Sequence, residues 1–510
     1  VTITAGLSVL AACSSSGGSG SAATPQATAA ATVAASGTPA ASAAAKAKLD
    51  APATVGMLTK DANLKNEQLP IFKWLKDATN ITIKPTVPAG TYKDALAVAM
   101  ASGELPDIVY IDGEALAIKY GEQGALLDLG KHLDKMPNLK AFWERNPELK
   151  KRGTGATGET YFAVHDGAGY GNQHAWMYRD EVFKAQSITP PKTWDELYAA
   201  LKKLKAAYPD SYPLTTRDGL GKVKSMASMF GSAPDVYRDA SGTVKFGPVE
   251  DGFKKLIEYY NTFYKEKLVN TDFLSATVQQ WQEMMTTNKG FVTLDYVGRA
   301  ELLDAAIPGG TGGKRSFTIM APPAGPNGKS LLVNGDYMLG GFTVFSKSKN
   351  LDATLHLIDY LYSDAGKELV SWGVEGQSYQ VAGGKKKMNG ANTQENKTTY
   401  GIMTFGSYGR FDKEAGLSLT ADIYKPDYEE ALKYKTPEIV LPPAFTGGEQ
   451  EIISTTYQQI LKDVDANLAK FIMGDRPLSE WNQYVAEIQK LGLQKVLDVY
   501  KAAWDRQSKK

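Results

Sequence analysis

The aromatic side chains are the most informative ligand-binding chemistry in this sequence. The 26 Tyr and 8 Trp together outnumber the 17 Phe. Tyr and Trp combine a flat apolar face with a polar tip, which suits a partly wet site. A sugar ring has an apolar C–H face and a belt of hydroxyls, so a sugar site needs aromatic platforms with Asp, Asn, Glu or Arg at the ring edge. Any single aromatic residue more often packs in the core than contacts a ligand. The whole set is therefore better evidence for a sugar site than any one residue in it. The aromatics in expected loops are Tyr110, Tyr170, Trp176, Tyr178, Tyr296, Tyr337, Trp372, Tyr379, Tyr400 and Tyr408.

Other chemical motifs give no support for catalysis. Gly153–Gly158 spells G-x-G-x-x-G, but a dinucleotide site needs a strand before this motif and a helix after it. Here a charged helix end precedes it and the strand-like Tyr161–Val164 follows, so we predict a turn. The sequence contains no Walker A loop, no H-E-x-x-H, no G-x-S-x-G and no Asp-rich calcium loop. Pairs of Asp and Glu are so common in a sequence that they do not identify the two catalytic acids of a glycosidase. We therefore predict no catalytic residue, no metal and no cofactor.

Composition narrows the class of protein further. A chain of 510 residues with 43% apolar and 22% charged residues is expected to form two or three soluble folding units. The 57 basic residues are balanced by 56 acidic ones, which gives no support for nucleic-acid binding. A single cysteine excludes an intramolecular disulfide and a cysteine-based metal cluster.

The N-terminal segment indicates where in the cell the protein is located. Ile3–Ala12 is a short apolar run, too short for a membrane span of about 20 residues but suited to the core of a secretory signal. The first residue is Val1, which we expect to reflect a truncated start. Leu10–Cys13 resembles a bacterial lipobox, in which the cysteine is lipidated; the alternative is a free cysteine. Residues 14–49 are mostly Ala, Ser, Gly, Thr and Pro, which predicts a disordered tether.

The body begins with alternating strands and helices, which predicts a parallel, doubly wound α/β sheet. Ligands of such sheets bind at the carboxyl ends of the strands. Lys60 and Asp61 follow the first expected strand and Asp112 follows the third, so we expect all three at the rim of a site. The expected strands are Ala53–Leu58, Ile81–Ile83, Asp107–Ile111, Phe291–Leu294 and Phe342–Phe345, and the expected helices are Glu67–Ala78, Tyr92–Ala101, Trp194–Ala207, Leu351–Ser363 and Thr456–Met473, the last capped by Gly474.

Several segments resemble the extracellular solute-binding proteins of bacterial ABC importers, specifically the large lipoprotein subgroup of family 1 that serves carbohydrate uptake. The likeness runs from about residue 50 to 506, and its most specific part is the C-terminus. Some relatives have a calcium loop where this chain has Tyr208–Leu214, so we expect no structural calcium there. The segments that carry the likeness are Ala101–Val109, Gly341–Asn350, Ile358–Ser363, Trp372–Tyr379, Phe471–Gly474, Trp481, Tyr484, Leu491–Leu493 and Ala503–Arg506.

The resemblance implies a two-lobed fold like that of periplasmic binding proteins, in which each lobe is a mostly parallel sheet flanked by helices and the C-terminus is helical. We expect residues 50–174 and 333–380 in the N-terminal lobe, and 175–332 and 381–510 in the C-terminal lobe. Ligand contacts are expected first from Trp176 and Tyr178 on one lobe, opposed by Tyr110, Asp112 and Trp372 on the other. The second-rank candidates are Asp295, Tyr296, Tyr337, Glu375 and Tyr379.

The function implied by the resemblance is capture of an oligosaccharide between the lobes and its delivery to the permease subunits of an ABC importer. The expected protein is monomeric, is not an enzyme, and is held by lipid on Cys13 at the outer face of the bacterial cell membrane. Two alternatives stay open, an importer subunit for a peptide or polyamine and a secreted carbohydrate-active enzyme. The sequence does not specify the length, linkage or charge of the sugar.

Overall fold

The computed structural model describes residues 48–167, 173–310, 312–332, 340–404, 408–435 and 442–508. The predicted lipidation site Cys13, the predicted tether up to residue 47 and the candidate Tyr337 lie outside these residues. Short 3₁₀ segments connect several elements, at Ala62–Lys65 (η1), Leu129–His132 (η2), Met226–Phe230 (η4), Gly247–Val249 (η5) and Leu478–Glu480 (η7).

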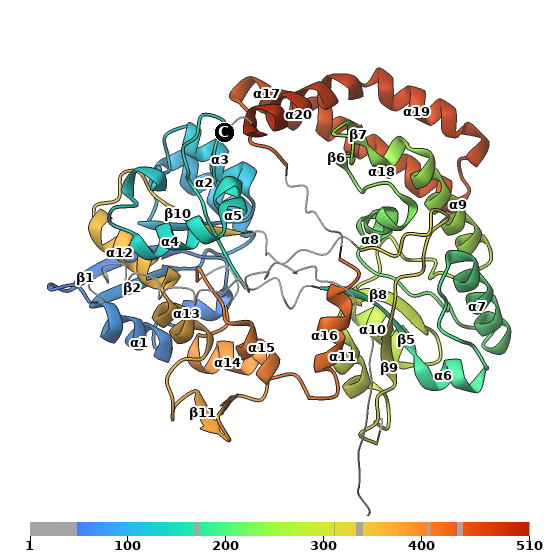
Figure 1. Cartoon of the computed structure of the whole chain (residues 1–510), viewed down its shortest axis with the longest axis horizontal. Coiled ribbons are helices and arrows are strands. Elements are labelled where there is room, and N and C mark those ends of the chain that lie inside the picture. The colour runs from blue at the N-terminus through green and yellow to red at the C-terminus, as the bar shows by residue number, and fades with distance from the viewer. Residues whose placement is uncertain are drawn as a thin grey trace, which may run out of the picture. The chain divides into compact units, whose positions relative to one another are not determined.

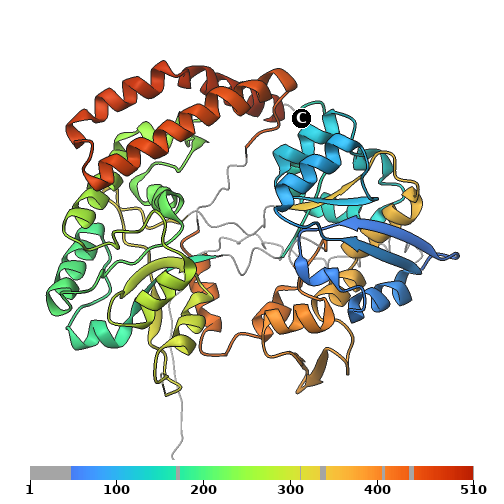
Figure 2. The ribbon, with the colours of Figure 1, turned by 180° about the vertical axis from the view of Figure 1, so that it is seen from behind.

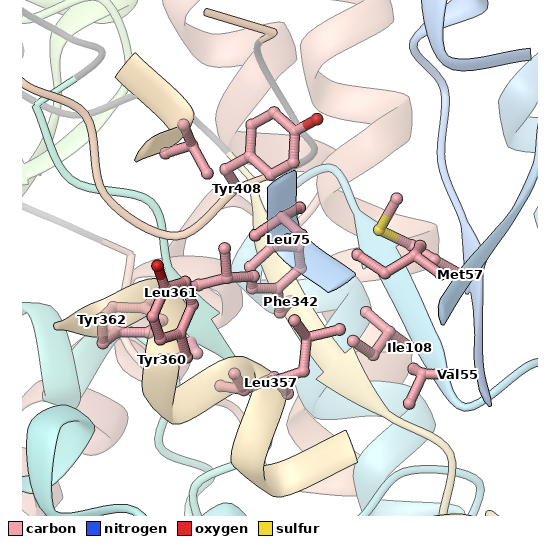
Figure 3. Close-up of a cluster of buried hydrophobic side chains, with 14 of the residues drawn as sticks. Val55, Met57, Leu75, Ile108, Phe342, Leu357, Tyr360, Leu361, Tyr362 and Tyr408 are labelled. Atoms are coloured by element: carbon pink, nitrogen blue, oxygen red, sulfur yellow. The ribbon is translucent and has the colours of Figure 1, made fainter. Parts of the chain in front are cut away.

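One buried cluster forms the core of a first lobe, and part of it is drawn in Figure 3. Val55 and Ile108 from the early strands pack with Phe342, Leu357 and Tyr408 from much later in the chain. In Figure 1 the blue early segment and the gold segment after residue 340 accordingly form one body. Its elements are β1 (Ala53–Leu58), α1 (Pro70–Thr79), β2 (Ile81–Thr86), α2 (Tyr92–Ser102), β3 (Ile108–Ile111), α3 (Glu114–Glu122), α4 (Pro137–Arg145), α5 (Pro147–Arg152), β4 (Ala163–Val164), β10 (Gly341–Val344), α12 (Leu351–Tyr362), α13 (Asp364–Ser371), β11 (Tyr379–Ala382), β12 (Lys385–Met388), α14 (Thr393–Tyr400) and α15 (Lys413–Ser418).

A second large cluster, with two smaller ones beside it, forms the core of a second lobe. The C-terminal helices α18 and α20 pack on α9 and β7, and Figure 2 shows these red helices beside the green part of the chain. The elements are β5 (His174–Arg179), α6 (Asp180–Ala185), α7 (Trp194–Ala207), α8 (Gly219–Ser225), β6 (Val236–Arg238), β7 (Val244–Phe246), α9 (Asp251–Lys265), α10 (Val278–Thr286), β8 (Val292–Tyr296), α11 (Arg299–Ala306), β9 (Phe317–Met320), α16 (Lys425–Leu432), α17 (Gly447–Ile452), a π-helical turn η6 (Ile453–Tyr457), α18 (Gln458–Met473), α19 (Trp481–Lys490) and α20 (Leu493–Ser508).

The two lobes repeat one strand arrangement. In the first lobe the order is β2-β1-β3-β10-β4, with β1 parallel to β2 and β3, and with β10 antiparallel to both of its neighbours. In the second lobe Leu214 makes parallel bridges to Val269 and to Val292 of β8, and β5 is antiparallel to both β8 and β9. The reversed strand is in each case the first strand after the chain arrives from the other core, because it enters the sheet from the opposite end.

The prediction of a mostly parallel sheet therefore needs a correction in the second lobe. The three named strands β8-β5-β9 pair only antiparallel, and the parallel part is reduced to the single residue Leu214 between its two partners. A one-residue bridge carries no alternating or continuous apolar run, so this part of the sheet leaves little pattern in the sequence.

The predicted lobe boundary near residue 380 is too early. Met388, Ile402, Phe411 and Ala415 are buried in the core of the first lobe, whereas Tyr428 is the first residue of α16 to join a cluster of the second lobe with Ala175 and Val297. Among the described residues, the chain therefore changes core between Val164 and Ala175, between Leu332 and Phe342, and between Ala415 and Tyr424.

Most predicted elements occur within a few residues of their expected bounds. Helix α1 begins at Pro70 rather than Glu67, because proline is favoured in the first helical turn and Asn66 holds a turn before it through its bond from Gln68. Helix α7 begins where the Thr193 hydroxyl accepts a hydrogen bond from the Glu196 amide. Gly474 ends α18 with a φ of 89°, as predicted for a left-handed cap.

Candidate ligand-binding site

The carboxyl edge of β1 and β3 carries a connected polar group. Lys60 follows β1 and Asp112 follows β3, and their Nζ and Oδ1 atoms are 2.6 Å apart. The Tyr110 hydroxyl donates to the same Asp112 oxygen at 2.8 Å, and Lys60 Nζ lies 4.9 Å from the Tyr110 ring centroid. Parallel strands bring their carboxyl ends to one edge, which is why residues 52 apart in sequence meet here. Lys60 and Asp112 therefore lie together at the carboxyl edge of the sheet, and their part in a ligand site stays a prediction.

Tyr110 is buried beneath this edge and holds Asp112 in place, so its ring is not exposed for stacking on a ligand. Its side chain is 1% exposed, and its ring is flanked by Tyr92 and His165, with centroids 6.2 and 5.6 Å away. Burial and the bond to Asp112 raise the pKa of Tyr110, which keeps its proton for donation to the carboxylate. Burial, with a smaller contribution from Lys60, lowers the pKa of His165 to about 3. Asp61, the other predicted rim residue, instead caps η1 by accepting from the Asn63 amide.

The corresponding edge of the second lobe holds a denser set of charges. Arg217 follows Leu214 in the chain and donates two hydrogen bonds of 2.7 Å to Asp295 near the end of β8. A third donor of Arg217 reaches Asp218 Oδ1 at 2.8 Å. Asp295 has no exposed surface and also accepts from the Tyr296 amide. Asp295 is thus fully engaged inside the protein, and its predicted role as a direct ligand contact is not supported.

Tyr296 is the aromatic residue of this edge. It ends β8, is half-buried, and its ring lies 4.5 Å from the His174 ring at an angle of 31°. Lys222 Nζ and Arg217 Cζ lie 5.7 and 5.9 Å from the Tyr296 ring centroid. Burial, followed by the charge of Lys222, lowers the pKa of His174 to about 3, so the imidazole is neutral at pH 7. Tyr296 therefore offers an aromatic surface next to several cations.

The two leading aromatic candidates are core residues. Trp176 has no exposed surface and packs edge-on against Trp194, with centroids 6.1 Å apart. Tyr178 is 7% exposed and lies against Phe183. Both are on β5, which has β8 and β9 on its two sides and a buried cluster on each face, so neither ring can stack on a ligand. The prediction that they form the platform of the second lobe is wrong.

Another group of predicted contacts in the first lobe consists of Trp372, Tyr379 and Glu375. Trp372 is 3% exposed and donates to Asp412 Oδ2 at 2.9 Å, and its ring lies 5.6 Å from that of Tyr379. Lys386 Nζ lies 5.4 Å from both rings. Glu375 is exposed in the loop before β11. These residues connect α13 to the β11–β12 hairpin, and Trp372 and Tyr379 are buried there.

Sequence reasoning missed Arg217, Lys222, Arg299 and His174. The only available signal was the run Thr215–Asp218 after an apolar Pro-Leu pair, which has the strand-then-polar form seen after β1. The signal is weak because the strand is a single bridged residue.

A cavity of about 710 Å³ lies near the start of α11, and Tyr296, Arg217 and Lys222 are not among its lining residues. It is lined by Gly298 and Leu302 of the α11 region, Leu417 of α15, Asn392 and Tyr428. The segment Gly153–Gly158 is a turn, with the Gly155 amide donating to the Glu159 carbonyl at 2.7 Å. Within the described ranges, no helix is long and apolar enough to cross a membrane, and no group of three or more His, Cys, Asp or Glu is arranged to hold a metal ion.

Comparisons with known proteins agree with this architecture. The family model "Bacterial extracellular solute-binding protein" matches residues 58–368. Lipoprotein LipO of Bacillus subtilis is 26% identical over 62% of this chain and 66% of its own length. The fructooligosaccharide ABC transporter substrate-binding protein FusA of Streptococcus pneumoniae is 24% identical over 99% of this chain and 97% of its own. The crystal structure of the alginate-binding protein AlgQ2 without calcium ion superposes with a TM-score of 0.75 and 22% identity, covering 90% of this chain and 99% of AlgQ2. The chain has the two-lobed α/β fold of these binding proteins and belongs to the bacterial extracellular solute-binding protein family.

Proposed function

We propose that this chain is the substrate-binding lipoprotein of an ABC importer, which captures an oligosaccharide between its lobes and presents it to the membrane permease. In this proposal Cys13 carries the lipid that holds the protein at the outer face of the cell membrane, and the protein acts as a monomer. The names of two relatives support the carbohydrate class, since FusA is named for fructooligosaccharides and AlgQ2 for alginate.

The observation that carries the proposal is the pair of equivalent strand edges. Each lobe places a cation after its central strand and a carboxylate beside it, as Lys60 with Asp112 and Arg217 with Asp295. One edge adds the half-buried ring of Tyr296. An aromatic face for sugar C–H groups together with charged groups for sugar hydroxyls is what an oligosaccharide requires.

Capture then follows from what each edge offers the ligand. Lys60 and Asp112 are 32% and 49% exposed, so their ion pair contributes little to stability and can exchange for hydroxyl contacts at small cost. Tyr296 would stack one ring from the other lobe. A sugar that touches both edges favours the closed state through contacts that the open state lacks, and the closed state is the form a permease would recognise. No step in this cycle is catalytic.

Thermal unfolding of the whole chain with a panel of neutral and uronic oligosaccharides tests the proposal. A sugar that binds only the folded state adds roughly 2.7 kcal/mol of stability at a hundred times its dissociation constant. We expect a raised melting temperature with one linkage series, and chromatography of the recovered sugar should find it intact. No shift with any sugar, together with a shift for peptides or polyamines, would assign the protein to another solute; hydrolysed sugar would make it an enzyme.

A further inference from the structure

Lys222 is a buried cation that has no hydrogen bond within the described part of the chain. It lies in α8, and its side chain is 4% exposed. Among the described residues, the nearest carboxylate oxygen is Asp218 Oδ2, which is 3.8 Å from Nζ and outside hydrogen-bonding distance. Burial is the main cause of a lowered pKa for Lys222; the charges of Asp295 and Asp218 oppose this shift, and those of Arg217 and Arg299 add to it. A buried ammonium without an acceptor is costly, so such a group usually has a partner.

The neighbouring acids are already occupied. Asp295 accepts two hydrogen bonds from Arg217, and Asp218 accepts another from the same guanidinium. Arg299 reaches Asp295 only at 3.8 Å and is 26% exposed. Arg217, Lys222 and Arg299 thus share two carboxylates; Arg217 hydrogen-bonds to both, whereas Lys222 and Arg299 each lie 3.8 Å from one of them. Among the described residues, this edge therefore has one more cation than carboxylates, and Lys222 and Arg299 are the cations without a hydrogen-bonded carboxylate.

The Lys222 ammonium lies over the aromatic ring of Tyr296. Lys222 Nζ is 5.7 Å from the Tyr296 ring centroid, and Tyr296 is backed by the neutral His174. Arg299 begins α11 three residues after Tyr296. A group stacked on Tyr296 would therefore lie close to Lys222, and Arg299 is held at the same edge by its 3.8 Å contact with Asp295.

We propose that Lys222, assisted by Arg299, is a subsite for the carboxylate of a uronic acid residue whose ring stacks on Tyr296. This inference rests on the proposed function and names the substrate class within it. A carboxylate supplies both the missing acceptor and the missing negative charge, and a sugar hydroxyl would supply only the acceptor. The ligand class that fits this site is an acidic oligosaccharide containing uronic acid.

The test compares an oligogalacturonate with the same oligosaccharide after reduction of its carboxyl groups, by calorimetric titration into the full chain. We expect the wild-type protein to bind the acidic form at least tenfold more tightly than the reduced form. In Lys222→Met that preference should fall to less than twofold, because the acidic form loses roughly 10- to 100-fold in affinity and the neutral form changes little. Lys224→Met is the matched control, since Lys224 is on the same helix but pairs with Asp465 of α18; it should keep the wild-type preference.

A second readout separates a binding role from a structural one. Removing a buried, unbonded ammonium should leave the melting temperature of unliganded Lys222→Met equal to or above that of the wild type. A lower melting temperature together with an unchanged preference for the acidic sugar would make Lys222 a structural residue and overturn the inference.

The outcomes also distinguish this inference from the proposed function. Tight binding of the reduced, neutral sugar with no preference for the acidic form would overturn the carboxylate subsite and leave oligosaccharide capture intact. Binding of a sulfated neutral-backbone oligosaccharide but not of the uronate would assign the subsite to another anion and contradict the inference. If neither acidic nor neutral sugars bind, both the carboxylate subsite and the proposed oligosaccharide capture are wrong.

Discussion

At the scale of single residues, this site depends on which charged groups the fold has already paired. Asp295 looks like a ligand contact by position, yet Arg217 holds both of its oxygens and none of its surface is exposed. Lys222 in α8 is the opposite case, because the nearest carboxylate oxygen among the described residues is 3.8 Å from its Nζ. The amino-acid composition cannot show which charged side chains are paired, because their partners come from distant parts of the sequence.

The Arg217–Asp295 pair is expected to stabilise the second lobe. In Arg217→Met the Asp295 carboxylate would stay buried without its bidentate partner, which typically costs about 3–5 kcal/mol of unfolding free energy. Urea denaturation at pH 7 measures this loss. The exposed pair Lys135–Asp352 supplies the control, since Lys135→Met should leave the stability close to that of the wild type. An equal effect of the two substitutions would refute the structural role of the pair.

His165 should make the protein sensitive to acid. Its pKa of about 3 in the folded state lies below the usual value of 6.5, so between these two pH values the unfolded chain binds more protons. Stability from this residue is therefore fully present above pH 6.5 and decreases as the pH falls. At pH 5 the loss amounts to about 2 kcal/mol relative to pH 7.

The variant His165→Phe isolates this contribution. Phenylalanine retains an aromatic ring next to Tyr110 and Phe342, and it does not titrate. Urea denaturation at pH 7 and pH 5 should show a smaller pH-dependent loss in the variant than in the wild type, by about 2 kcal/mol. The same loss in both proteins would mean that other groups cause the acid sensitivity.

At the scale of elements, the sequence predicts those whose signals are local. β1 and the start of α2 match the predicted bounds, and Gly474 ends α18 as its left-handed cap. The parallel bridges at Leu214 could not be predicted, because one paired residue leaves no pattern. Trp176 was misassigned because a tryptophan in a strand covered on both faces has the same composition signal as one at a ligand surface. Lys60 and Asp112 were placed correctly because topology alone brings them to one edge.

The cap at Gly474 gives a test at this scale. Its φ of 89° is a backbone conformation that an L side chain adopts only with strain, so Gly474→Ala should cost about 1 kcal/mol of unfolding free energy. Gly416 is the matched control, because it lies inside α15 with open space where a Cβ would be added. Gly416→Ala should be neutral or stabilising by up to about 1 kcal/mol. If both substitutions changed the melting temperature in the same direction, the capping role would be wrong.

At the scale of the whole molecule, two lobes with the same strand arrangement are joined by three passages of the chain. Each lobe has its own buried core, so each can remain intact while the angle between them changes. The charged edge of each sheet lies at the carboxyl ends of its strands, where binding sites in such sheets are found. The central claim of the account is that one ligand engages both edges.

Calorimetric titration of the best-binding oligosaccharide into one variant of each edge tests that claim most directly. Tyr296→Ala and Asp112→Asn should each weaken binding by about 10- to 100-fold, from lost stacking and from lost charged hydrogen bonds. Tyr198→Ala and Asp352→Asn, matched changes away from both edges, should leave the affinity within twofold. A loss in both edge variants supports capture between the lobes. Wild-type affinity in either Tyr296→Ala or Asp112→Asn would contradict it, because the ligand would then be held by one lobe alone or elsewhere.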